Sequence, residues 1–275
     1  MQIYRHMDIA TAKPSRKEQS ALPHHLIDII NPDEEFNAGM FSALAGQKVS
    51  ELHENIRIPV VVGGTGLYIK SLVYGLIQAP PKSEKLRGYF RTLKRKKGPG
   101  HVWSVLERLD PASAEKISPN DSVRILRYLE IIFFTGVRPS SLHKRHGFAE
   151  PAYHVQTVCI MPDRQKLYGS IDKRVHAMID QGLVEETQGL LERGYSPALR
   201  SMQTLAYRHI TGYLDSQLSL DQAVSLIQRD TRHYAKRQIT WIRSHHSQER
   251  YHTLEECRSI MPRLLDGISD RSWRQ

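Results

Sequence analysis

A helix-length segment between two short apolar runs constrains the fold of this chain more than any other feature. The runs, Leu26–Ile30 and Ile58–Val62, are rich in β-branched residues and are flanked by proline and glycine, as buried strands of a parallel sheet are. Between them, Ala38–Asn55 has the apolar spacing of a helix. Because a helix that connects two parallel strands is the building unit of α/β folds, the sequence predicts an α/β core. Val155–Met161 is a third strand candidate.

The residues between the second and third strand candidates have a different pattern. From about residue 82 to residue 146 the spacing is helical, and a basic run, Arg91–Lys97, lies within this stretch. We therefore predict a helical insertion domain at residues 82–146. The α/β core would comprise residues 1–81 and 147–275, and its last part is again helical in pattern.

The charge balance narrows the class of partner. The chain has 275 residues and a formal net charge of +10, which favours a polyanionic partner, either nucleic acid or a phosphorylated substrate. Its two cysteines, Cys159 and Cys257, form no CxxC pair, and no histidine shows metal-ligand spacing, so we predict a reducing compartment and no metal site. The apolar runs are too short to cross a bilayer, and the first residues lack a signal-peptide core. These features predict a soluble cytoplasmic protein without a membrane partner.

One helix-length stretch, Asp230–Arg243, carries a row of cations. Spacings of three and four residues put one set of side chains on a single helical face: Arg229, Arg232, Lys236, Thr240 and Arg243. Another face, which we expect to be buried, carries Tyr234, Gln238, Trp241 and Ile242. A solvated basic face is the usual explanation of such a row. Binding to phosphates is favoured here because two further segments point to the same ligand class.

The first of these segments, Val60–Lys70, runs from a strand candidate into the glycine-rich turn Gly63–Gly66 and then into a helix. Ligands of open α/β sheets bind at the carboxyl ends of strands, where glycines allow a close approach. Thr65 would then present its hydroxyl and amide to an anion or a base edge. A tight turn with Thr65 as a helix cap is an equal alternative. The spacing is not that of a phosphate-binding loop.

The second segment, Asn120–Glu130, begins with an Asn-Asp helix cap and places Arg124 and Arg127 one turn apart. Two arginines at this spacing suit a nucleic-acid backbone or a base. A pair of surface salt bridges is the alternative interpretation.

Six segments, taken in order, resemble the tRNA dimethylallyltransferase (IPP transferase) family from residue 1 to about Arg243: MQIYRHMDIATAKP, PHHLIDI, VVGGTGLYIKSL, NDSVRILRYLE, GYSPALRSMQTLAYRHI and TRHYAKRQITWIR. The resemblance implies transfer of a dimethylallyl group from dimethylallyl diphosphate to N6 of the adenosine 3′-adjacent to the anticodon. It also implies a monomeric cytoplasmic enzyme that uses Mg²⁺ and binds the tRNA anticodon stem-loop. The implied fold is a P-loop-type parallel sheet with a helical insertion.

The same resemblance implies which residues form the site. Those that match tRNA contacts of the family are Met1, Gln2, Thr65, Arg87, Val123, Arg124, Ile125, Leu126 and Arg127. Those expected near the diphosphate and the RNA backbone are Arg232, Lys236 and Arg237.

The chain also departs from the family pattern. Family members have a phosphate loop, and then an Asp proposed as general base, ahead of the Ser-Met-Gln run whose Met is the first residue here. We therefore expect the first strand, the loop, its Mg²⁺ ligand and the base to be missing from this sequence, and assign no catalytic residue. Smaller departures are Ala10, Val123, Arg200 and Ala206.

Two explanations of the missing phosphate loop and base stay open. Either the true start codon lies upstream and the chain is part of a working transferase, or the gene is truncated. In the second case the chain would be inactive, a non-catalytic tRNA-binding remnant of such an enzyme. A small-molecule kinase or another P-loop nucleotide enzyme is a rival that the fold alone suggests.

Overall fold

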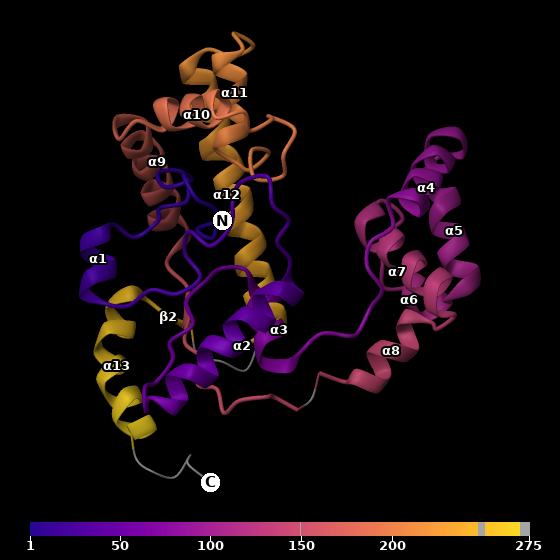
Figure 1. Ribbon diagram of the computed structural model, residues 1–275, viewed down its shortest axis with the longest axis horizontal. Helices are drawn as coiled ribbons and strands as arrows, with labels where there is room; N and C mark the ends of the chain where they lie inside the picture. The colour runs from indigo at the N-terminus through magenta and orange to yellow at the C-terminus, as the bar shows by residue number, and fades with distance from the viewer. Residues whose placement is uncertain (149, 247–250, 270–275) are drawn as a thin grey trace. The chain divides into compact units, whose positions relative to one another are not determined.

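The computed structural model describes residues 1–148, 150–246 and 251–269 (Figure 1). The chain divides into two compact units. The core unit consists of Met1–Leu72 and His154–Gln275, and the helical unit of Val73–Tyr153. The insertion predicted at residues 82–146 lies within the helical unit.

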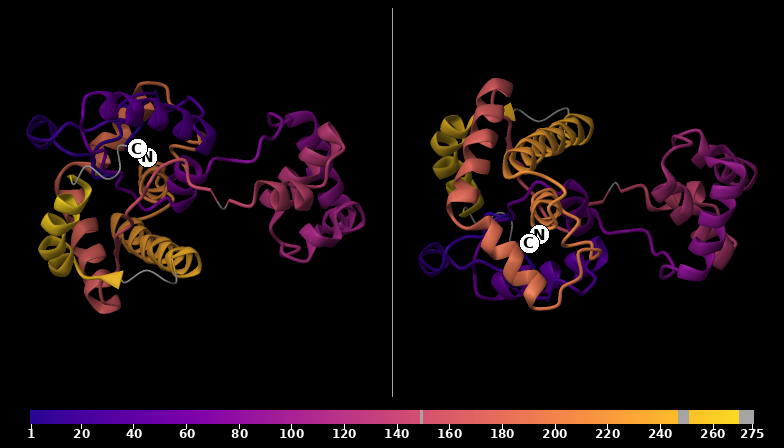
Figure 2. Two further views of the ribbon diagram at one scale, coloured as in Figure 1. Left: turned by 90° about the horizontal axis from the view of Figure 1, so that it is seen from below. Right: turned by 90° about the horizontal axis from the view of Figure 1, so that it is seen from above.

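Four helices of the core unit enclose its apolar core: α9 (Arg164–Asp180), α10 (Leu183–Glu192), α11 (Tyr207–Leu214) and α12 (Leu220–His245). The N-terminal segment adds the buried side chains of Tyr4 and Met7 to this core. The longest helix, α12, begins at a capping box in which Ser219 and Gln222 satisfy each other's free amides. It runs beside α9, as Figure 2 shows. The basic stretch of the sequence therefore lies on a helix whose other side is anchored in a core.

Three further helices of the core unit come from the first part of the chain: α1 (Arg16–Ala21), α2 (Ala38–Glu54) and α3 (Gly66–Tyr74), whose last two residues belong to the helical unit. The last described helix, α13 (Leu254–Ser269), follows β2. The predicted helix Ala38–Asn55 is confirmed as α2, and it begins where the Asn37 side chain accepts two free amides. Two hydrogen bonds join α2 to α3. Ser42 Oγ donates to the Ser71 carbonyl over 2.8 Å, and Ser71 Oγ donates to the Ala38 carbonyl.

The predicted parallel sheet is small. Its strands in the described ranges are β1 (Cys159–Ile160) and β2 (Tyr251–His252), which pair in parallel with Cys159 opposite Tyr251. Of the predicted strand Leu26–Ile30, only Ile30 takes part in an isolated parallel bridge, with Tyr4. The run Ile58–Val62 forms no ladder with any described residue.

The run Leu26–Ile30 does meet a partner, since the amides of Asp28 and Ile29 donate to the carbonyls of Gln2 and Ile3 over 3.1 and 2.9 Å, but it forms one bridge and no ladder. The prediction was wrong for Ile58–Val62 because a strand needs a partner. Apolar spacing indicates which side chains avoid water, but a ladder forms only where a neighbouring segment offers matching amides and carbonyls. The run Ile58–Val62 pairs with no neighbouring strand in the described ranges, and its Val62 side chain is 89% exposed. The chain is mostly helical, with a small parallel sheet.

The helical unit contains α4 (Glu84–Lys97), α5 (Pro99–Leu109), α6 (Pro111–Ala114), α7 (Ser122–Thr135) and α8 (Pro139–His146). The helical pattern predicted for this stretch is confirmed, and residues 73–148 and 150–153 contain no strand. Phe90, Leu106 and Leu129 lie at the centre of its own apolar core. Among the helices that the structure describes, none combines the length and the apolarity needed to cross a membrane.

Candidate functional site

The glycine-rich turn Gly63–Gly66 packs directly against α12. Gln238 Nε2 donates to the Gly64 carbonyl over 3.2 Å, and a Cβ added at Gly66 would lie 2.2 Å from a ring carbon of Trp241. Only glycine permits so close an approach at this position. Of the face predicted to be buried, Gln238, Trp241 and Ile242 are partly buried. The prediction was wrong for Tyr234, which is 37% exposed. Thr65 is exposed just before α3, and its carbonyl accepts the amide of Tyr68 over 2.9 Å.

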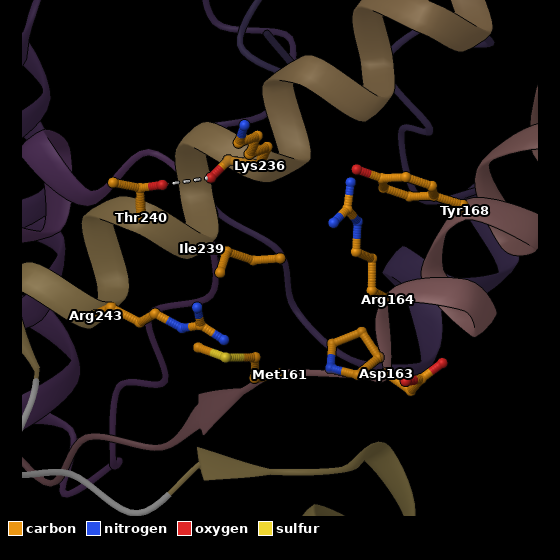
Figure 3. Close-up of a pocket in the computed structure, with 9 residues that line it drawn as sticks. Met161, Asp163, Arg164, Tyr168, Lys236, Ile239, Thr240 and Arg243 are labelled. Carbon is orange, nitrogen blue, oxygen red and sulfur yellow. Dashed lines mark hydrogen bonds between the residues drawn. The ribbon is translucent and has the colours of Figure 1, made fainter.

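A pocket of about 480 Å³ opens on another face of α12, toward the first turn of α9 and the end of β1 (Figure 3). It is lined by Met161, Pro162, Asp163, Arg164, Tyr168, Lys236, Ile239, Thr240 and Arg243. Lys236, Thr240 and Arg243 come from the predicted basic face of α12. In Figure 3, Arg164 extends from α9 beside the ring of Tyr168, its guanidinium 5.2 Å from the ring centroid.

The charge of this pocket is positive. Arg164, Lys236 and Arg243 line it together with one carboxylate from the described residues, that of Asp163. Asp163 caps α9 and accepts the amides of Gln165 and Lys166 over 2.9 and 3.1 Å. These hydrogen bonds, with the amide of Lys166 contributing most, hold the pKa of Asp163 below its usual value. Asp163 therefore stays ionised at the start of the helix, and the three cations outnumber it, so the pocket keeps an excess of positive charge that attracts a polyanion.

The three residues expected near the diphosphate lie in different surroundings. Lys236 lines the pocket. Arg232 lies behind it, where it forms an ion pair of 2.5 Å with Asp172 and lies 5.8 Å from the centroid of the Tyr168 ring. Arg237 is exposed, packs over the ring of Tyr234 and does not line the pocket.

The expected tRNA contacts Met1 and Gln2 lie in the core unit. Met1 is 45% exposed. The side-chain amide of Gln2 donates to the carbonyls of Thr11 and Ala12 over 3.2 and 2.8 Å. The backbone carbonyl of Gln2 accepts the amide of Asp28 over 3.1 Å, so this residue is fixed at both ends.

Arg87, in the helical unit, is buried and bound to a buried carboxylate. Its Nε and Nη2 donate to Glu130 over 2.6 and 2.9 Å. The same carboxylate accepts the Ser83 amide over 2.9 Å and Arg127 Nη1 over 3.2 Å. Burial raises the pKa of Glu130, but the hydrogen bonds from Arg87, Ser83 and Arg127 outweigh it and hold this pKa below its usual value. Arg87 thus links α4 to α7 through Glu130.

The expected contact segment Val123–Arg127 follows the predicted cap, since the Asp121 side chain accepts the Arg124 amide at the start of α7. Val123 is 76% exposed, and Arg124 forms an ion pair of 2.6 Å with Asp121. Ile125 is buried in the core of the unit, and Leu126 is partly buried against it. Both arginines therefore form ion pairs within their own helix or its cap, as in the alternative interpretation of this segment.

The family of the chain follows from its sequence match. The profile of the family described as IPP transferase matches residues 2–245. The chain belongs to the IPP transferase family. The matched range contains α12, the glycine-rich turn and all the pocket-lining residues.

Relatives and solved structures agree with this family. The tRNA dimethylallyltransferase 1 of Syntrophotalea carbinolica is 45% identical over 240 residues, covering 87% of this chain and 76% of that protein. The tRNA dimethylallyltransferase of Geobacter sulfurreducens is 43% identical, covering 88% and 78%.

Among solved structures, the tRNA isopentenylpyrophosphate transferase of Bacillus halodurans has a TM-score of 0.60 and 36% identity, covering 88% of this chain and 75% of that one. A eukaryotic dimethylallyltransferase acting on tRNA has a TM-score of 0.73 and 25% identity, covering 88% and 61%. These neighbours share an α/β fold with this IPP transferase.

The residues that line the pocket from outside the predicted basic face, Arg164 and Tyr168 among them, were missed in the sequence of this IPP transferase. The available signal was the run Pro162-Asp163-Arg164 directly after the third strand candidate. A helix cap followed by a cation at the carboxyl end of a strand is a typical position for an anion-binding residue.

Proposed function

We propose that this chain modifies tRNA by transferring a dimethylallyl group from dimethylallyl diphosphate to N6 of the adenosine 3′-adjacent to the anticodon. The observation that carries the proposal is the cationic pocket on α12, in the same unit as the glycine-rich turn that α12 also contacts. Relatives named tRNA dimethylallyltransferase, 45% identical in one case, support it. The pocket of about 480 Å³ is of a size that small ligands of this kind fill.

The pocket has suitable chemistry for both halves of a prenyl diphosphate. Lys236, Arg164 and Arg243 would neutralise the charge that develops on the departing diphosphate, which lowers the barrier to breaking the carbon–oxygen bond. The apolar surface of Met161 and Ile239 would receive the five-carbon chain and exclude water from it.

Asp163 is a poor candidate for the base that removes the proton of the attacking amine. Its carboxylate is already bound by the amides of Gln165 and Lys166, and its pKa is lowered by them. A base works best when its pKa lies near the pH of the reaction. We therefore propose that the pocket contributes charge neutralisation, and that a group outside the pocket takes the proton.

The described residues gather no set of side chains that alone would hold Mg²⁺. In these ranges, no three His, Cys, Asp or Glu side chains gather as a metal site, and the one carboxylate of the pocket caps a helix. Mg²⁺ needs carboxylate or phosphate oxygens around it. The positive charge that this part of the chain itself contributes to the pocket comes from arginine and lysine. The expected requirement for Mg²⁺ stays a prediction, which transfer assays with and without a chelator would check.

We propose that Gln2 and Thr65, whose side chains are half-buried and exposed, contact the tRNA anticodon stem-loop from the core unit. The helical unit offers the exposed side chains of Val123 and Arg124, each as a separate candidate for a tRNA contact. A tRNA substrate is consistent with a cytoplasmic enzyme, and the presence of all these groups on one chain is consistent with a monomer. We also propose a P-loop-type core, which the parallel pairing of β1 and β2 supports.

Alanine substitutions in the pocket test the proposal. We expect Lys236→Ala and Arg164→Ala each to weaken dimethylallyl diphosphate binding by about tenfold or more, since a charge-assisted hydrogen bond contributes roughly 1.5–3 kcal/mol. Lys166→Ala, on the same turn of α9 but outside the pocket, is the matched control. Binding would be measured by calorimetry, and transfer by incorporation of labelled prenyl groups into tRNA.

The outcomes separate the alternatives. Equal effects of the Arg164 and Lys166 substitutions would contradict the pocket assignment. Binding of tRNA without any transfer, even at high protein concentration, would favour the non-catalytic tRNA-binding alternative.

A further inference from the structure

Consecutive backbone amides of the N-terminal segment converge on one carboxylate, that of Glu186 in α10. Glu186 Oε2 accepts the amides of Asp8 and Ile9 over 2.9 and 2.8 Å, and Oε1 is 3.4 Å from the amide of Ala10. Tyr207 Oη donates to Oε1 over 2.7 Å. Such a run of amides forms a concavity that binds an anion, and here the anion belongs to the protein itself.

The carboxylate of Glu186 acts as a hydrogen-bond acceptor for all the groups around it that the preceding contacts name. Tyr207 is fully buried, and its burial, together with the charge of Glu186, raises the pKa of its phenol far above the usual value. The phenol therefore stays protonated and donates. An ionised carboxylate only accepts, so it satisfies all four donors. A glutamine at this position would turn an NH₂ group toward at least one of them.

The amides bound by Glu186 belong to a tightly folded segment, Met7–Ala12. Thr11 Oγ1 donates to the Met7 carbonyl over 2.7 Å, and the Ala12 amide donates to the Ile9 carbonyl over 3.1 Å. Ala12 has a φ of 48°, a left-handed conformation that a side chain with a Cβ disfavours. The segment therefore depends on contacts from outside itself, and Glu186 provides the largest polar one.

The carbonyls of this segment fix the side chain of Gln2. Its amide nitrogen lies 3.2 Å from the Thr11 carbonyl oxygen and 2.8 Å from that of Ala12. Since both neighbours are acceptors, only the nitrogen of the amide can face them. Both N–H groups are then used within the protein, and Oε1 is the atom of Gln2 left for a ligand.

We infer that Glu186 is a positioning residue: by ordering Met7–Ala12 it sets Gln2 to present an acceptor oxygen to a base N–H of the tRNA substrate. The inference rests on the proposed function. An amino or imino N–H of a base is the matching chemical group, because it donates. A phosphate oxygen only accepts, so a contact of Gln2 Oε1 with a phosphate group is not expected. Gln2 would thus contribute to base recognition rather than to electrostatic attraction.

A double-mutant cycle in tRNA binding tests this coupling. The full chain and its variants Gln2→Ala, Glu186→Gln and the double variant would be compared by filter binding to the anticodon stem-loop. We expect each single substitution to weaken binding by about tenfold, the size of one hydrogen bond in this setting. The double variant should bind the stem-loop about as tightly as the weaker-binding single variant, because both substitutions remove the same contact. The matched control is Glu185→Gln, an exposed neighbour on α10.

Two results would overturn the inference: binding by Glu186→Gln equal to that of the unsubstituted chain, or a loss in the double variant equal to the product of the single losses. If Glu186→Gln does not melt cooperatively, Tyr207→Phe replaces it in the cycle, since it removes one donor to Glu186 and leaves the carboxylate. With this variant we expect a two- to fivefold loss that disappears in the Gln2→Ala background. Failure of the unsubstituted chain to bind the stem-loop would instead contradict the proposed function.

Discussion

Replacing Gly66 by alanine tests the contact between the glycine-rich turn and α12. Gly66 is the first residue of α3, where helix propensity alone favours alanine over glycine by about 0.8–1 kcal/mol. The added Cβ would lie 2.2 Å from a ring carbon of Trp241. Ordinary carbon contacts are about 3.5–4.0 Å, so the ring or the turn has to move by more than about 1 Å. The two effects therefore have opposite signs.

The steric effect should prevail. Trp241 stacks on His245 with a centroid distance of 4.2 Å and an interplanar angle of 9°, which restricts its movement. Overpacking of this kind costs about 1–3 kcal/mol. After the gain in helix propensity, we expect a net loss of up to about 2 kcal/mol. Because Trp241 and Lys236 are on the same helix, we also expect weaker dimethylallyl diphosphate binding.

Gly63→Ala is the matched control, since a Cβ there meets no atom within 4 Å. The free energy of unfolding would be measured by urea titration, with thermal melting as a second probe. In a chain of this size, about 1 kcal/mol corresponds to roughly 2–4 °C. In a Trp241→Ala background, Gly66→Ala should cause no further loss. The reasoning is refuted if Gly66→Ala is as stable as Gly63→Ala, or more stable.

Three further substitutions test individual interactions. Glu130→Ala should cost about 3–5 kcal/mol in urea unfolding, because it leaves the guanidinium of Arg87 buried without its partner; a loss below 1 kcal/mol would contradict this. Burial raises the pKa of Asp230, but hydrogen bonds from Arg229 and His209 outweigh it and lower this pKa to about 2 from 3.8. The ionised carboxylate therefore stabilises the fold above about pH 4, and this stabilisation is lost as the pH falls toward 2. Asp230→Asn should thus lower the free energy of unfolding by roughly 1–2 kcal/mol at pH 7 and by almost nothing near pH 2. Asn37→Ala, which removes the cap of α2, should cost about 1 kcal/mol at any pH between 5 and 8, by thermal melting.

The sequence by itself determined the features that depend on neighbours along the chain. The helix predicted at Ala38–Asn55 is α2, and Asp121 caps α7 as expected. The division of α12 into a basic face and a contact face is confirmed by Lys236 in the pocket and by Trp241 against Gly66. Helical spacing and caps act over three or four residues, so the order of residues is sufficient to reveal them.

The tertiary structure decided which distant segments meet. Apolar spacing marked Ile58–Val62 for burial but could not supply a neighbouring strand. The fold brings Arg164 to the pocket of α12, although the local signal at Asp163 and Arg164 does not say which helix they meet. No local feature distinguishes Glu186, which binds amides 176 to 178 residues away. The family resemblance implied that Arg87 contacts tRNA. Only the packing of α4 against α7 reveals that Arg87 forms an ion pair with the buried carboxylate of Glu130. Contacts between distant segments depend on how whole elements pack, and no short stretch of sequence contains that information.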